Sequence, residues 1–159
     1  MPPQTLISLN VIVCEKILFE QDQIYSAVRI VDVFYFRRDA NLPIESQPIP
    51  LCILVSGKTQ PEDKAEHSVQ LVLVRPNGES TPIGEPLRAV FEAVLKEQGR
   101  SLLVDGSKES DIAGGFTVRA EINIVPRAVG RHQIEVFLDD ILVARTPFTI
   151  LELKPRTND

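Results

Sequence analysis

The sequence has no tryptophan, only two cysteines and two histidines, and no long apolar run. A helix that spans a bilayer needs about 20 apolar residues, so we expect no transmembrane helix. The first residues, Met-Pro-Pro-Gln-Thr, carry neither the basic start nor the cleavage site of a signal peptide. We therefore expect a cytoplasmic protein.

The two cysteines, Cys14 and Cys52, both lie within apolar segments. Thiols stay reduced in the cytoplasm, and a buried thiol without a neighbouring cation is inert. A bridge of the immunoglobulin type usually packs against a tryptophan, which this chain lacks. We therefore expect both cysteines to be reduced, buried and slow to react.

An excess of positive charge is also absent. The formal net charge is −5, the isoelectric point is about 5.1, and the only basic doublet is Arg37-Arg38. Proteins that bind nucleic acid or anionic membranes usually carry a basic stripe or patch. We expect neither as a partner of this protein.

The chain does contain many β-branched residues, with 17 Val and 15 Ile among 159 residues. These residues favour strands. The length predicts a single domain, residues 1–159, that can bury a core without disulfide or metal. We expect order from about residue 6 to residue 152 and a polar tail over residues 153–159.

Alternation of apolar and polar residues marks the strands, most clearly at residues 116–124. Turn residues such as Asn77-Gly78 and Asp139-Asp140 separate them. Residues 49–56 are apolar on both faces, which is typical of a central strand covered on both sides. The predicted strands cover residues 6–18, 24–36, 49–56, 68–75, 101–105, 116–124, 131–138 and 141–151.

One segment, residues 86–98, breaks the strand pattern. Its apolar residues are spaced as on one face of a helix, while charged residues take the other face. Pro86 suits a first helical turn and Gly99 a C-terminal cap. We favour an amphipathic helix here over the alternative, a strand. The chain is thus predicted to be an all-β, antiparallel β-sandwich of seven to eight strands with one inserted helix.

Two segments resemble a known family. Residues 131–151, an alternating strand, an Asp-Asp turn and a return strand, look like the last hairpin of an immunoglobulin-like domain. The opening VIVCEKILFEQDQIYSAVRIVDVFYF is similar to the start of a bacterial family of uncharacterised immunoglobulin-like proteins. The resemblance implies an immunoglobulin-like sandwich in a bacterial protein and assigns no catalytic residue.

The loop Asp105-Gly-Ser-Lys-Glu-Ser-Asp111 offers oxygen side chains at short spacing. Calcium prefers several such ligands, so Asp105, Glu109 and Asp111 are the candidates for a metal site. Lys108 in the middle of the loop favours an ordinary solvated loop instead. We expect no cofactor.

Signals of catalysis are weak. His67 and His132 lie far apart in sequence and in no zinc-ligand pattern, so we expect both on the surface. No nucleophile elbow or phosphate-binding loop is present. Asp32 lies on an apolar strand face, where we expect it to be paired or turned outward by a local bulge rather than tuned for chemistry.

Several strands carry apolar residues on the faces predicted to point outward, among them Val33, Tyr35, Leu54, Val72 and Val74. A helix of 13 residues is about 20 Å long and covers only part of a sheet. A second copy of the chain could cover the rest, so we predict a homodimer with these residues in its interface.

Two classes of function fit these observations. The first, which we favour, is a non-enzymatic intracellular interaction or scaffold domain that binds itself or another protein. The alternative is a small-ligand or metal-dependent module that uses loop carboxylates at one end of the sandwich.

Overall fold

The computed structural model describes residues 6–20, 25–59, 66–90 and 114–154. These residues form nine strands and one short 3-10 helix, Ile44–Ser46. The strands are β1 (Leu6–Phe19), β2 (Tyr25–Ile30), β3 (Val33–Phe36), β4 (Ile49–Thr59), β5 (Glu66–Val74), β6 (Ser80–Val90), β7 (Gly114–Ile124), β8 (Gly130–Leu138) and β9 (Ile141–Glu152).

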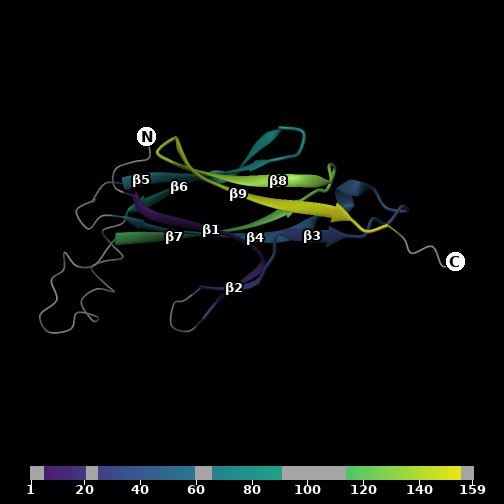
Figure 1. Cartoon of the computed structure of the whole chain (residues 1–159), viewed down its shortest axis with the longest axis horizontal. Coiled ribbons are helices and arrows are strands. Elements are labelled where there is room, and N and C mark those ends of the chain that lie inside the picture. Colours follow the sequence, from purple (N-terminus) through teal and green to yellow (C-terminus); the bar gives the residue numbers. More distant parts are fainter. Residues whose placement is uncertain (1–5, 21–24, 60–65, 91–113, 155–159) are drawn as a thin grey trace, which may run out of the picture.

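The strands make two sheets, which confirms the predicted β-sandwich. The four-stranded sheet has the order β2-β1-β4-β7, and the five-stranded sheet has the order β3-β9-β8-β5-β6. Every neighbouring pair is antiparallel except β3 and β9, which run parallel. Figure 1 shows the sheets as two stacked layers, with β2 projecting away from the layer of β1, β4 and β7.

The main core lies between the sheets, because alternate residues of each strand point inward. It is built from aliphatic side chains and two phenylalanines, Phe34 and Phe148, whose rings meet edge to face at 5.8 Å. The fully buried members include Ile53, Ile134 and Ile150. This packing holds the two layers together.

The central strand β4 is buried on both faces, as its sequence predicts. Its residues from Leu51 to Val55 are all buried. Leu51, Ile53 and Val55 belong to the main core, whereas Cys52 and Leu54 belong to a second cluster with Cys14 and Ile17. Residues of the β1–β2 hairpin pack against this outer face.

The predicted helix is wrong over the part that the structure describes. Residues 86–90 belong to β6 and pair with β5, Leu87 lying opposite Val69. Near Gly84, whose φ is +67°, β6 carries extra residues relative to β5 and the register shifts. The pairing with β5, which the spacing of the apolar residues does not reveal, makes this segment a strand. Residues 91–98 lie outside the described residues.

The predicted long strand over residues 24–36 is two strands in different sheets. The chain leaves the edge of the four-stranded sheet after Ile30 and enters the other sheet at Val33. Asp32 lies at this break, is exposed, and accepts a hydrogen bond on its carbonyl from the Thr149 amide at 2.8 Å. Of the two expected alternatives, pairing of Asp32 or a local bulge that turns it outward, the structure shows an outward-turned residue, at a break between two strands rather than at a bulge.

We predict that Gly57→Ala destabilises the protein by about 1–3 kcal/mol through overpacking. Gly57 lies directly opposite Phe116 in the β4–β7 register, and a methyl group on Gly57 would overlap the Phe116 ring. Without that overlap, alanine would make the protein more stable than glycine does in a strand. The sign of the change in unfolding free energy therefore shows whether the overlap matters. Urea unfolding measures it.

The control is the double variant Gly57→Ala/Phe116→Ala, compared with Phe116→Ala alone. Removing the ring should remove the penalty of the added methyl group. An equal penalty in both backgrounds would show that the ring contact is not the cause.

Candidate functional site

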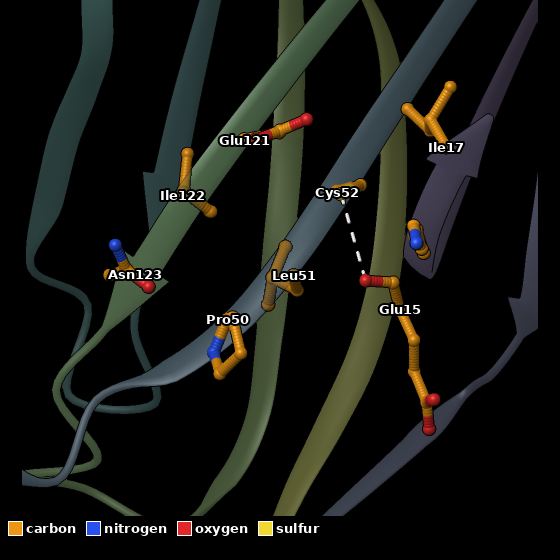
Figure 2. Close-up of a pocket in the computed structure, with 9 residues that line it drawn as sticks. Glu15, Ile17, Pro50, Leu51, Cys52, Glu121, Ile122 and Asn123 are labelled. Atoms are coloured by element: carbon orange, nitrogen blue, oxygen red, sulfur yellow. Dashed lines mark hydrogen bonds between the residues drawn. The ribbon is translucent and has the colours of Figure 1, made fainter. Parts of the chain in front are cut away.

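A groove of about 270 Å³ crosses the outer face of the four-stranded sheet. In Figure 2 Cys52 lies on the central strand between Glu121 on one side and Glu15 and Ile17 on the other. The residues that line it come from three adjacent strands: Glu15, Lys16 and Ile17 of β1, Pro50, Leu51 and Cys52 of β4, and Glu121, Ile122 and Asn123 of β7.

The two cysteines lie directly opposite each other on β1 and β4. Cys14 is fully buried and Cys52 is 7% exposed, at the groove. The Cys52 thiol donates to the Glu15 carbonyl at 3.7 Å and the Cys14 thiol to the Lys16 carbonyl at 3.5 Å. Both cysteines are free, so the prediction of buried, unbridged cysteines is confirmed.

Burial raises the pKa of the Cys14 thiol above its ordinary value of 9.0, and the nearby Cys52 raises this pKa further. The hydrogen bond to the Lys16 carbonyl lowers it, but less. Cys14 therefore stays a protonated thiol near neutral pH. A protonated thiol is a weak nucleophile, because only the thiolate is strongly nucleophilic.

The carboxylates beside the groove are paired with arginines. Glu15 lies 3.2 Å from Arg29 on the neighbouring strand β2, and Glu121 lies 2.7 Å from Arg119 on its own strand. These pairs are exposed and contribute little to stability. What the groove can offer a small ligand is therefore a thiol at its floor between paired charges.

A second pocket, of about 540 Å³, lies beside His67 and Asp139. His67 Nδ1 lies 2.6 Å from Asp139 Oδ2, and Asp139 Oδ1 accepts a hydrogen bond from the Ser68 amide at 2.9 Å. Asp139 begins the β8–β9 turn with φ +50°, and its carboxylate ties that turn to the start of β5. The pair orients the imidazole and places it at the pocket wall.

The prediction that both histidines lie on the surface is wrong. His67 is 7% exposed and His132 is 2% exposed. His132 stacks on Phe148 with ring centres 5.3 Å apart, and its Nδ1 lies 3.0 Å from the Gly130 carbonyl oxygen. The sequence did contain a signal for this burial. Each histidine lies an even number of residues from the inward-pointing residues of its strand, such as Val69 and Ile134, and therefore points to the same side.

The candidate metal ligands Asp105, Glu109 and Asp111 lie outside the described residues. Within the ranges that the structure describes, no group of three or more His, Cys, Asp or Glu residues could hold a metal ion. The same residues include no helix long and apolar enough to cross a membrane.

The residues predicted to form one interface lie in three places. Val33 and Tyr35 are on β3, Val72 and Val74 are on β5 of the same sheet, and Leu54 is on β4 of the other sheet. The two pairs are separated by β8 and β9, which carry the exposed ion pair of Glu135 with Arg145 at 3.0 Å. Leu54 is buried against the chain's own residues.

Comparison with known proteins identifies no family. No protein-family model and no curated protein matches the chain. An alkylpurine DNA glycosylase of Pseudomonas fluorescens, AlkC, bound to DNA with an abasic site analog, has a TM-score of 0.43 and 10% identity over 76% of this chain and 27% of its own. This chain therefore spans about a quarter of that glycosylase.

A Bordetella pertussis protein assigned the name ApaA has a TM-score of 0.34 and 12% identity over 98% of this chain and 100% of its own. At these scores neither structure bears on the function of this chain. The immunoglobulin-like resemblance of the two terminal segments stays a prediction.

We predict that His132 makes stability fall as the pH drops below about 6.5. Burial lowers its pKa from the ordinary 6.5, and the charge of Arg75 lowers it further against the hydrogen bond to Gly130. The unfolded chain then binds more protons than the folded one between the two pKa values, so the free energy of unfolding rises with pH there.

Urea unfolding of the wild type and of His132→Phe, between about pH 5 and 8, tests this. The phenylalanine keeps a ring against Phe148 and cannot titrate. As the pH falls, the unfolding free energy of the wild type should decrease more than that of the variant. A difference that does not change with pH would contradict the assignment.

Proposed function

We propose that this chain is a non-enzymatic cytoplasmic interaction module that works as a two-fold homodimer joined along residues 25–36. One observation carries the proposal. Consecutive strands β2 and β3 are outer strands of the two sheets, and both carry exposed large apolar side chains, Tyr25 and Ile30 on β2 and Tyr35 on β3. Such edges offer unpaired backbone groups to another chain.

The four outer strands differ in how well they are protected. β6 carries Pro82, Pro86 and the bulge near Gly84, and β7 carries the charges of Arg119 and Glu121. Prolines, bulges and charges prevent pairing between edges. In β2 and β3, by contrast, Arg29 is the only charged residue and there is no proline.

The exposed apolar area gathers at the same strands. Ile30 is 62% exposed and Tyr35 is 61% exposed. At the other end of β2 from Ile30, Phe19, 58% exposed, packs against Tyr25 with ring centres 5.2 Å apart. Several large apolar side chains exposed on outer strands support an interaction surface more than a single exposed residue does.

A second copy of the chain fits this surface better than an unrelated partner. In an antiparallel pair of β2 strands about a two-fold axis near Ala27 and Val28, Arg29 of one copy lies toward the Tyr25 end of the other. Like charges therefore do not meet, and the arginine can approach an aromatic ring. The four-stranded sheets would join into one continuous sheet, and Val33 and Tyr35 would extend the interface.

Light scattering after size-exclusion chromatography at micromolar concentration tests this proposal. The wild type should be a dimer, and Ile30→Lys should weaken it by at least about tenfold in dissociation constant, a change of 1.4 kcal/mol. Leu87→Lys is the matched control, because Leu87 is 46% exposed on β6, an outer strand outside the proposed interface.

The dimer should survive the Leu87→Lys change, and circular dichroism should show that both variants are folded. A monomeric wild type would overturn the proposal. Equal weakening by both substitutions would also overturn it, because the interface would then not lie along residues 25–36.

A further inference from the structure

We propose that Cys14 and Cys52 form a redox-active dithiol, which small hydroperoxides convert to a reversible disulfide between β1 and β4. This modification site is separate from the proposed dimer edge. It rests on the pairing of the two residues in the sheet and on the groove that reaches one of them.

The first argument is the geometry of the pair. Cys14 lies directly opposite Cys52 in the antiparallel β1–β4 register, and both side chains belong to the same small cluster on the outer face. Opposed residues of an antiparallel pair have Cα atoms about 4.5 to 5.5 Å apart. Disulfides span Cα separations of about 4.4–6.8 Å, so the bridge requires no change of register.

The second argument is that the two thiols differ in access. Cys52 lines the groove of about 270 Å³, whereas Cys14 is fully buried behind it. This volume is several times that of a water molecule, about 30 Å³, and therefore admits a small peroxide. Cys52 meets the oxidant first, and Cys14 is positioned to resolve the product.

The surroundings of the thiols support this order. Burial and the neighbouring Cys52 raise the pKa of Cys14, which keeps Cys14 protonated while Cys52 reacts. Cys52 is thus the thiol that the oxidant reaches, and Cys14 is the thiol that closes the bridge.

The reaction takes two steps. The Cys52 thiolate attacks the outer peroxide oxygen and breaks the O–O bond, giving a sulfenic acid on Cys52 and an alkoxide that takes up a proton. Cys14 then attacks the sulfenic sulfur, the S–S bond forms, and the hydroxyl leaves with the Cys14 proton as water. In sum, two thiols and one hydroperoxide give one disulfide, one alcohol and one water.

The test treats the full chain with tert-butyl hydroperoxide and measures its intact mass. The protein should lose two hydrogen atoms, and peptide mapping should find the Cys14–Cys52 bridge within one chain. Dithiothreitol should restore the original mass. The same result should appear in Ile30→Lys, which separates this site from the proposed dimer.

Two variants test the order of the thiols. In Cys14→Ala the reaction should stop at a sulfenic acid on Cys52, which dimedone traps, and in Cys52→Ala Cys14 should stay unmodified. A sulfenic acid on Cys14 in Cys52→Ala, together with an unmodified Cys52 in Cys14→Ala, would overturn the assigned order.

The wild-type measurements decide the proposal even if a variant fails to fold. Phenylarsine oxide, which needs two adjacent thiols, should bind the reduced wild type once per chain. Failure to form the bridge within one chain, or bridges only between chains, would overturn the proposal.

Discussion

The structure depends on the burial of β4 on both faces. An apolar strand in the middle of a sheet is stable only if both of its surfaces are removed from water. The five-stranded sheet covers the face with Ile53 and Val55, and residues of the β1–β2 hairpin cover the face with Cys52 and Leu54. The β1–β4 register ends at Cys14, and beyond it β1 pairs only with β2, so the hairpin is free to leave the sheet.

In this arrangement the outer strands of the two sheets differ in how well they are protected from pairing with another chain. Proline, glycine and charge protect β6 and β7, whereas the chain that covers β4 continues into two outer strands with little such protection. In the proposed dimer, the segment that completes the fold within the chain also contacts the second chain. Fold stability and the proposed association are therefore linked through residues 25–36.

The polar and sulfur-bearing residues of interest are brought together by strand register. Cys14 and Cys52 meet because β1 and β4 are neighbours, and His67 meets Asp139 because β5 starts beside the β8–β9 turn. Isolated in sequence, each of these residues looks unremarkable. Strand register brings these side chains into contact, and burial raises the pKa of the Cys14 thiol.

The sequence by itself determined the all-β class, most strand positions, the Asp139-Asp140 turn and the double-sided burial of β4, because alternation and turn residues act locally. The sequence also indicated the burial of both histidines, because each one alternates in step with the inward-pointing residues of its strand. Only the tertiary structure decided that residues 86–90 are a strand, that residues 24–36 divide between two sheets, and that Cys14 faces Cys52. Strand pairing and strand order bring together residues that are distant in sequence, so neither can be read from local periodicity.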